Sequence, residues 1–230
     1  HLCGVFDLSK KGWQFFVLAL LGITWGSSFV LMKKGLEAFN PLELARLRLA
    51  FAGFTLLPFI LPKLHKIPKT AWIWLSLTGL VGSGIPALLF AAGITRIDSS
   101  LAGIINSTAP IFTLLAGLLF FGLKVSKFGA IGIGIGLVGT VFLILSQKGL
   151  SVNGNQWVFA ALPLLGAICY GFSTNIIKSK LQGLSAVSVT GIALFLVGLP
   201  SAFWLLIDGT LSPCLHSPLH QKALIYVALL

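Results

Sequence analysis

Seven long apolar stretches with few charged residues occupy most of this 230-residue chain. Each is about 20 residues long, which is enough for a helix to cross the hydrocarbon core of a bilayer. Only 9% of the residues are charged, far below the roughly one quarter that is usual in soluble domains. Apolar and polar residues do not alternate, which disfavours a membrane β-barrel. The sequence therefore predicts an all-α polytopic membrane protein, a helical bundle with spans at residues 13–32, 42–61, 71–94, 98–121, 128–146, 156–177 and 185–207.

The chain weakly resembles itself at an offset of about 145 residues. The segment Trp25-Gly26-Ser27-Ser28 matches Tyr170-Gly171-Phe172-Ser173, and the same shift places Leu49 on Leu194 and Gly53 on Gly198. Five spans lie within the offset, and an odd number of crossings gives the second copy the opposite orientation in the bilayer. Two inverted repeats around a central binding site are the usual scaffold of secondary transporters.

This repeat predicts the domain organisation. We expect a first five-span repeat over residues 1–150 and an incomplete second repeat over residues 151–230. An eighth span begins near Ala223, and the sequence stops inside it at Leu230 after starting with His1 instead of Met. We therefore expect this chain to be a C-terminally truncated piece of a ten-span protein.

The net charge of +11 is spread over the ends of the spans and does not gather on one face. This distribution argues against nucleic-acid binding and favours a topological role. An inside N-terminus places nine lysines on the cytoplasmic side and five basic loop residues on the other, which agrees with the positive-inside rule. The nine are Lys10, Lys11, Lys63, Lys66, Lys69, Lys124, Lys127, Lys178 and Lys180, and the five are Lys33, Lys34, Arg96, Lys148 and Lys222. We expect a bacterial inner-membrane protein with a cytoplasmic N-terminus.

The second span begins with a strong helix-start signal. Asn40 is placed as the N-cap, Pro41 as the first helical residue and Glu43 as the partner that completes a capping box. Arg46 follows Glu43 by three residues, a spacing at which an ion pair forms on one helix face. A coupling role for Glu43 and Arg46 is the alternative to this structural interpretation.

Arg48 is the most informative charge in the chain. It points about 200° away from Arg46 around the helix, and charges within spans usually face the protein interior or a hydrated cavity. Its guanidinium suits a carboxylate or a phosphate. Snorkelling to the membrane surface is the alternative. Under the repeat Arg48 aligns with Ala193, so the scaffold itself does not require the charge.

The fourth span carries a second group of candidates near mid-membrane, Asn106, Ser107 and Pro110. Polar side chains and a proline at this depth must bond across helices or line a cavity. Trp25 and Tyr170, equivalent under the repeat, are candidates to face each other across that cavity, with packing as the alternative. The remaining candidates for the substrate pathway are Ser28 and Asn175.

Small residues four apart, at Gly22 and Gly26, Gly79 and Ser83, and Gly132 and Gly136, predict close helix packing.

The sequence lacks the residues that several kinds of enzyme and metal chemistry require. No histidine lies in a full span to act as the base of an intramembrane protease, and Pro218 interrupts the spacing of Cys214, His216 and His220. No phosphate-binding loop is present. We therefore expect no enzyme activity, no metal and no cofactor.

These motifs together resemble the drug/metabolite transporter superfamily, in its EamA-type branch of ten-span permeases. The resemblance rests on W-G-S-S-F at 25–29, on Pro41 followed by Arg48, and on S-T-A-P-I-F-T at 107–113. Its matched positions are Trp25, Arg48 and Pro110. Many members carry a glutamate after the glycine that ends the fourth span, whereas Leu123 follows Gly122 here.

The resemblance implies a permease or exporter of small metabolites such as amino acids, working by alternating access between the two repeats. Its expected partners are a small-molecule substrate and the lipid bilayer, without nucleic acid, and a homodimer is left open. Two alternatives are a membrane enzyme acting on lipid-linked substrates and a non-transporting membrane interaction protein.

Overall fold

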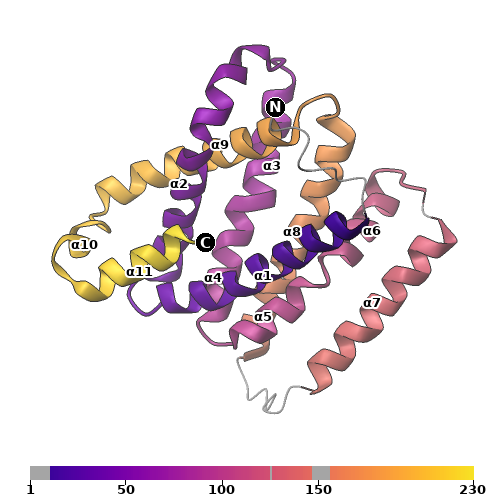
Figure 1. Ribbon diagram of the computed structural model, residues 1–230, viewed down its shortest axis with the longest axis horizontal. Helices are drawn as coiled ribbons and strands as arrows, with labels where there is room; N and C mark the ends of the chain where they lie inside the picture. Colours follow the sequence, from indigo (N-terminus) through magenta and orange to yellow (C-terminus); the bar gives the residue numbers. More distant parts are fainter. Residues whose placement is uncertain (1–10, 125, 147–155) are drawn as a thin grey trace.

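The computed structural model describes residues 11–124, 126–146 and 156–230, and every regular segment in these ranges is helical. The first half comprises α1 (Lys11–Gly35), α2 (Pro41–Ile60), the 3₁₀ turn η1 (Leu61–Lys66), α3 (Ala71–Gly79), the π-helical η2 (Leu80–Gly84), α4 (Ile85–Ile94), α5 (Ser99–Asn106), α6 (Ala109–Phe120) and α7 (Lys127–Ser146). The second comprises α8 (Gln156–Lys180), α9 (Ala186–Ile207), α10 (Ser212–His216) and α11 (Pro218–Ala228). Figure 1 shows them in one bundle.

Six helical segments are long and apolar enough to cross a membrane, and they coincide with six of the seven predicted spans. The remaining predicted span, 128–146, corresponds to α7, a helix of 20 residues whose part Phe128–Thr140 is apolar. Many large apolar side chains point outward, including Phe128 at 87% exposure and Leu119 at 74%. Helices satisfy their own backbone hydrogen bonds, so such surfaces are stable in lipid. The prediction of an all-α polytopic membrane protein is confirmed.

The helix α2 packs most extensively on α9, and the contact between them is reciprocal. A Cβ atom added at Gly53 would lie 2.9 Å from the carbonyl oxygen of Leu194, and one added at Gly198 would lie 2.5 Å from that of Leu49. Gly53 and Gly198 are equivalent at the 145-residue offset, and so are Leu49 and Leu194. The two contacts are therefore reciprocal at this offset, because each glycine meets the residue that corresponds to the other glycine's contact.

The neighbouring helices extend the same relation. The α3 helix packs on both α8 and α9, and α11 packs on both α1 and α2. At the 145-residue offset, α8 corresponds to α1, α9 to α2, and α11 overlaps the equivalent of α3. The predicted boundary between residues 150 and 151 lies outside the described residues, as do Lys10 and Lys148.

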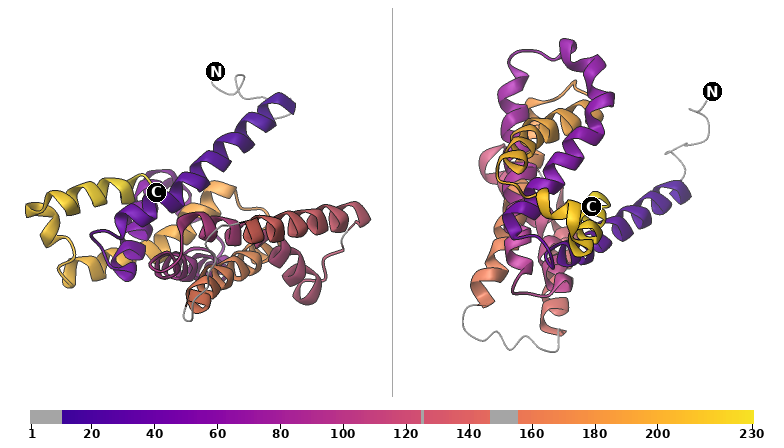
Figure 2. Two further views of the ribbon diagram at one scale, coloured as in Figure 1. Left: turned by 90° about the horizontal axis from the view of Figure 1, so that it is seen from below. Right: turned by 90° about the vertical axis from the view of Figure 1, so that its left-hand side faces the viewer.

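The predicted close packing of the small-residue pairs holds for Gly79 but not for the pairs on α1 and α7. Gly79 lies against the backbone of Ala193 and is a true close-packing site. Gly22, Gly26, Gly132 and Gly136 have open space where a Cβ would stand. Their faces of α1 and α7 meet no other helix among the described residues, and Figure 2 shows that the N-terminal part of α1 projects from the bundle. The spacing identifies small residues but not whether a partner covers them.

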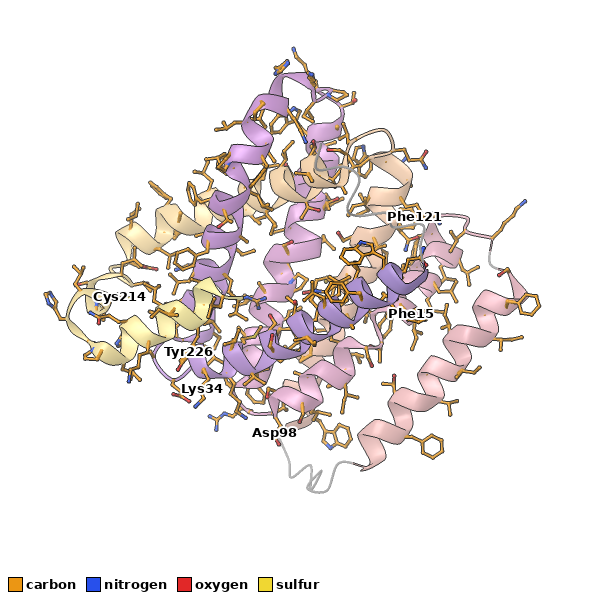
Figure 3. All side chains as sticks on the ribbon, in the orientation of Figure 1. Phe15, Lys34, Asp98, Phe121, Cys214 and Tyr226 are labelled. Atoms are coloured by element: carbon orange, nitrogen blue, oxygen red, sulfur yellow. The ribbon has the colours of Figure 1, made fainter. Side chains whose placement is uncertain are left out.

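The two ends of the bundle differ in their charged residues, and we call them the ion-pair end and the lysine end. The ion-pair end carries Glu37, Glu43, Asp98 and Asp208, which are all the acidic residues in the described part of the chain. The lysine end carries the η1 region, the α6–α7 connection and the α8–α9 connection, with Lys63, Lys66, Lys69, Lys124, Lys178 and Lys180. Lys34 and Asp98 are labelled at the ion-pair end in Figure 3.

Candidate functional site

The start of α2 forms the predicted capping box. The side chain of Asn40 accepts hydrogen bonds from the backbone N–H groups of Leu42 and Glu43, each at 3.0 Å. The Glu43 carboxylate accepts the backbone N–H of Asn40 at 2.8 Å. Three backbone donors at the helix start are thereby satisfied. The carboxylate of Glu43 thus has a structural role at the end of the span.

The expected ion pair between Glu43 and Arg46 is replaced by a longer-range one. Glu43 turns back to the cap, and the Arg46 guanidinium donates to the Asp208 carboxylate at 2.6 Å, just beyond the end of α9. It also lies over the Trp204 ring, 5.7 Å from its centroid. Arg46 therefore ties the start of α2 to the end of α9, a bond that its spacing from Glu43 did not indicate.

Arg48 points into a different environment from Arg46, as predicted. It lies seven residues into α2, about 10 Å below the helix start at 1.5 Å per residue. Its one recorded hydrogen bond in the described chain runs from Nη1 to the Met32 sulfur at 3.8 Å. A thioether is a weak acceptor, whereas a guanidinium carries five N–H donors. Most of the hydrogen-bonding capacity of Arg48 is therefore unused within the described residues.

Arg48 lines a cavity of about 240 Å³ between α2 and the end of α11. The α2 side is formed by residues on the same helix face as Arg48, and the α11 side is apolar. No carboxylate of the described chain lies within ion-pairing distance of this arginine. The lining residues are Arg48, Phe51, Ala52, Thr55, Leu56, Val227, Ala228 and Leu230.

Tyr170 on α8 packs against the apolar cluster that contains Met32 and Phe90. Its ring stacks on Phe90 of α4 with centroids 5.9 Å apart, and Phe90 contacts Phe29 of α1 at 5.6 Å. Side chains from α1, α2, α4 and α8 therefore meet in one apolar cluster, which includes Met32, the recorded partner of Arg48. Trp25, by contrast, is 64% exposed on α1, and the structure records no ring contact between it and Tyr170. The described chain does not bring these two aromatic residues together.

The fourth predicted span breaks at the polar group that the sequence singled out. The helix stops at Asn106 and restarts at Ala109, before Pro110, which lacks an N–H donor. Ser107 contacts the Thr140 hydroxyl of α7 at 3.2 Å. The side-chain oxygen of Asn106 is buried and has no hydrogen-bond partner among the described residues. Asn106 is thus a polar acceptor held unused at a helix break.

The side-chain amide of Asn175 is used in helix packing. Its amide nitrogen donates to the carbonyl oxygen of Thr113 at 2.7 Å and to that of Gly171 at 2.8 Å, which joins α8 to α6. Ser28 is half-buried on α1. A place in the substrate pathway stays a prediction for both Ser28 and Asn175. The hydrogen bonds of Asn175 favour a structural role for that residue.

Sequence reasoning missed Met32, Phe90 and Asp208, which complete the surroundings of the two arginines. Met32 and Phe90 are apolar residues in apolar spans, so no local signal marks them. Asp208 ends a span and lies 162 residues from Arg46. The one available signal was that an acidic residue ends one span while an arginine lies near the start of another. That signal does not specify which basic residue pairs with the acid.

Comparison with known proteins agrees with the helical architecture. The sequence model of the EamA-like transporter family matches residues 12–145. The chain is 36% identical over 166 residues to the uncharacterized inner membrane transporter YedA of Escherichia coli K12, covering 70% of this chain and 51% of that protein. It is 28% identical to a probable amino-acid metabolite efflux pump of Salmonella typhimurium LT2, covering 73% and 54%.

A third relative is a probable terminal-alkyne amino-acid exporter of Streptantibioticus cattleyicolor, which is 24% identical over 77% of this chain and 59% of its own length. The chain spans about half the length of the curated relatives it matches most strongly. The family match covers more than half of the 230 residues and coincides with α1 to α7. This integral membrane protein belongs to the EamA-like transporter family.

Proposed function

We propose that the full-length protein is a secondary transporter that moves small metabolites such as amino acids across the bacterial inner membrane. Family membership and the names of the relatives support membrane transport of this class. The reciprocal contact of α2 and α9 supports alternating access between two inverted repeats, with residues 1–150 as the first and 151–230 as part of the second. Transporters of this design hold substrate between their repeats, near mid-membrane.

The observation that carries this proposal is the position of Arg48, inside a span, beside a cavity and without a carboxylate partner among the described residues. A cationic group about 10 Å inside a span is costly unless it is paired or hydrated. In the described residues it has a weak sulfur acceptor, a cavity and no carboxylate. We assign it to the carboxylate of the substrate, with which a guanidinium forms two parallel hydrogen bonds. The unused oxygen of Asn106 is a candidate acceptor for a substrate donor.

The cytoplasmic position of the N-terminus belongs to the same proposal. It places the lysine end inside the cell and the ion-pair end outside. Single cysteines introduced at Lys69 and at Ser212, in a background where the native Cys3, Cys169 and Cys214 are replaced by serine, are labelled in intact cells with an impermeant thiol reagent to test it. Labelling is expected at position 212 alone, and labelling at position 69 alone would reverse the orientation.

A membrane enzyme and a non-transporting interaction protein are the two competing functions. An enzyme acting on lipid-linked substrates would use clustered acids or histidines. The four described acids are instead committed to the helix cap and to ion pairs with lysine or arginine. An interaction protein would have no use for an unpaired arginine beside a cavity. These contacts favour transport over both.

The test is uptake and efflux of labelled amino acids by the full-length protein in proteoliposomes. Arg48→Gln is compared with Arg96→Gln, which removes an arginine that lies over the Phe159 ring. Loss of a charged hydrogen-bonding partner is expected to weaken apparent substrate affinity by about tenfold to a hundredfold in Arg48→Gln. The Arg96 variant should transport normally. Equal transport by both variants would remove Arg48 from the substrate site.

A further inference from the structure

A second cavity, of about 500 Å³, opens at the lysine end, away from Arg48. It lies between two connections that are far apart in sequence, one joining α2 to α3 and the other joining α8 to α9 (Figure 1). Its polar lining comes from both connections. The residues that define it are Lys66, Thr70, Trp74, Lys180, Gln182 and Gly183.

The floor of this cavity is packed. Ile67 and Leu181, one from each connection, are buried in the same apolar cluster as Ile60, Leu75 and Ile192. Leu181 is 3% exposed and Ile192 is fully buried. Because these residues anchor both connections to the helices, Lys66 and Lys180 are held on opposite walls of a formed pocket.

The charge of this cavity is positive and is not neutralised by the described chain. The Lys180 ammonium lies over the Trp74 ring, 5.3 Å from its centroid. Neither lysine has a carboxylate partner, because all four acidic residues of the described ranges belong to the ion-pair end. The start of α3 adds the positive end of a helix dipole beside Thr70. Only an anion from outside the described residues complements this pocket.

The cavity also lies at the depth of lipid headgroups. It surrounds the first residues of the span Ala71–Ile94 and the last residues of the span Trp157–Lys180. Tryptophan and lysine at such positions are typical of the membrane interface. Ile73, next to Trp74, is 67% exposed, and Phe59 and Leu61 are 61% and 55% exposed. These exposed apolar side chains belong to the helical segments that lead into and out of the α2–α3 connection, and they offer a surface for acyl chains at the same end of the bundle as the pocket.

We propose that this pocket binds the phosphate of an anionic phospholipid headgroup. Lys66 and Lys180 contact the phosphate oxygens, and the hydroxyl of Thr70 and the amide of Gln182 accompany them. A basic pocket between spans is a recognised kind of lipid site. The adjoining apolar surface favours a lipid over a soluble phosphate, because it binds the acyl chains that the soluble ion lacks. The site is separate from the proposed substrate site.

The test measures lipid retained by the full-length protein in native mass spectrometry after exchange into mixed micelles of phosphatidylglycerol and phosphatidylcholine. Wild type is expected to retain phosphatidylglycerol selectively. The double variant Lys66→Gln with Lys180→Gln should lose about tenfold of that selectivity, because both headgroup cations are gone. A matched control, Lys63→Gln with Lys124→Gln, removes two charges from the same end outside the pocket lining and should keep it.

Replacing both pocket lysines by arginine should restore retention, since the charge and donors return. Size-exclusion profiles of all variants verify folding. Equal retention by the pocket and control variants would overturn the proposal, and so would equal retention of the two lipids by wild type. Competition by inorganic phosphate as strong as that by phosphatidylglycerol would also overturn it, since the ligand would then be a soluble anion.

Discussion

The two ends of the bundle carry basic residues in different surroundings. At the ion-pair end Lys33 bonds Asp98 at 3.2 Å, Lys34 bonds Glu37 at 2.9 Å and Arg46 bonds Asp208 at 2.6 Å. At the lysine end the described residues include no acid, and Lys180 has only an aromatic ring as a recorded partner. Basic residues therefore join helices at one end and remain available for external anions at the other. A basic residue forms an ion pair where an acidic residue is near, and it stays available to attract an external anion where none is.

The largest expected effect comes from disrupting the close crossing of α2 and α9. Gly198→Val puts a branched side chain against the Leu49 backbone, which cannot retreat as a flexible side chain can. Overpacking of this kind is expected to cost about 3 kcal/mol of stability. The measurement is thermal unfolding of the purified full-length protein in detergent. Gly132→Val, at a position with open space, is the control. Similar melting of both variants would show that the crossing is not close-packed.

A smaller effect is expected from removing one ion-pair partner. Asp208→Asn leaves Arg46 half-buried with the Trp204 ring and without its carboxylate. We expect a decrease in Tm, because the bond holds α2 to the end of α9. Lys180→Gln at the lysine end should leave Tm unchanged. Both are measured by thermal unfolding, and an equal loss in the two variants would remove the distinction between the ends.

Acid should act on the ion-pair end alone. The hydrogen bond from Thr210 and the charge of Arg46 lower the pKa of Asp208 below its ordinary value. Its stabilising contribution is therefore present above about pH 4, near the unfolded pKa, and is lost as the pH falls through the lower folded pKa. The Tm of wild type should fall more steeply below about pH 4 than that of Asp208→Asn. Parallel pH profiles would contradict this assignment.

The smallest expected effect concerns exposed lysines. Lys33→Gln removes a pair with Asp98 in which both side chains are largely exposed, and such pairs contribute about 0 to 1 kcal/mol. Lys69→Gln, at the lysine end, removes a charge with no recorded ion pair. A slight fall in Tm for the first, abolished by about 0.5 M salt, and none for the second are expected from thermal unfolding. A salt-independent difference would show that packing, not charge, separates the two lysines.

Local features of the site were predictable from the sequence, and distant contacts were not. The capping box lies within four residues, so its spacing alone predicts its hydrogen bonds. The opposite directions of Arg46 and Arg48 follow from helix geometry. The partner of Arg46 lies 162 residues away on another helix, where sequence spacing carries no information. For the same reason Met32 beside Arg48 was not predictable.

The 145-residue offset relates residues of distant helices that no single motif connects. Aligning Gly53 with Gly198 marked the two glycines that meet at the α2–α9 crossing. The small-residue spacing selected Gly79, which is close-packed, together with Gly22 and Gly132, which have open surroundings. Internal symmetry identifies residues that share an environment, whereas spacing describes one helix without its partner. The polar residues and the proline near Asn106 were singled out by their depth, but the sequence predicted one continuous span over 98–121, and the interruption between α5 and α6 was not predicted.

The π-helical turn Leu80–Gly84 has a consequence for the aromatic contacts near Arg48. The N–H of Ile85 donates to the carbonyl of Leu80, five residues back, so this turn holds one residue more than an α-helix would. One residue corresponds to a rotation of about 100°. Without it, α4 would turn Phe90 away from Tyr170, and the ring stack would be lost. A single-residue deletion within 80–84 would therefore rotate the second half of the span, Ile85–Ile94, about the helix axis while leaving every residue of α4 in place in the sequence.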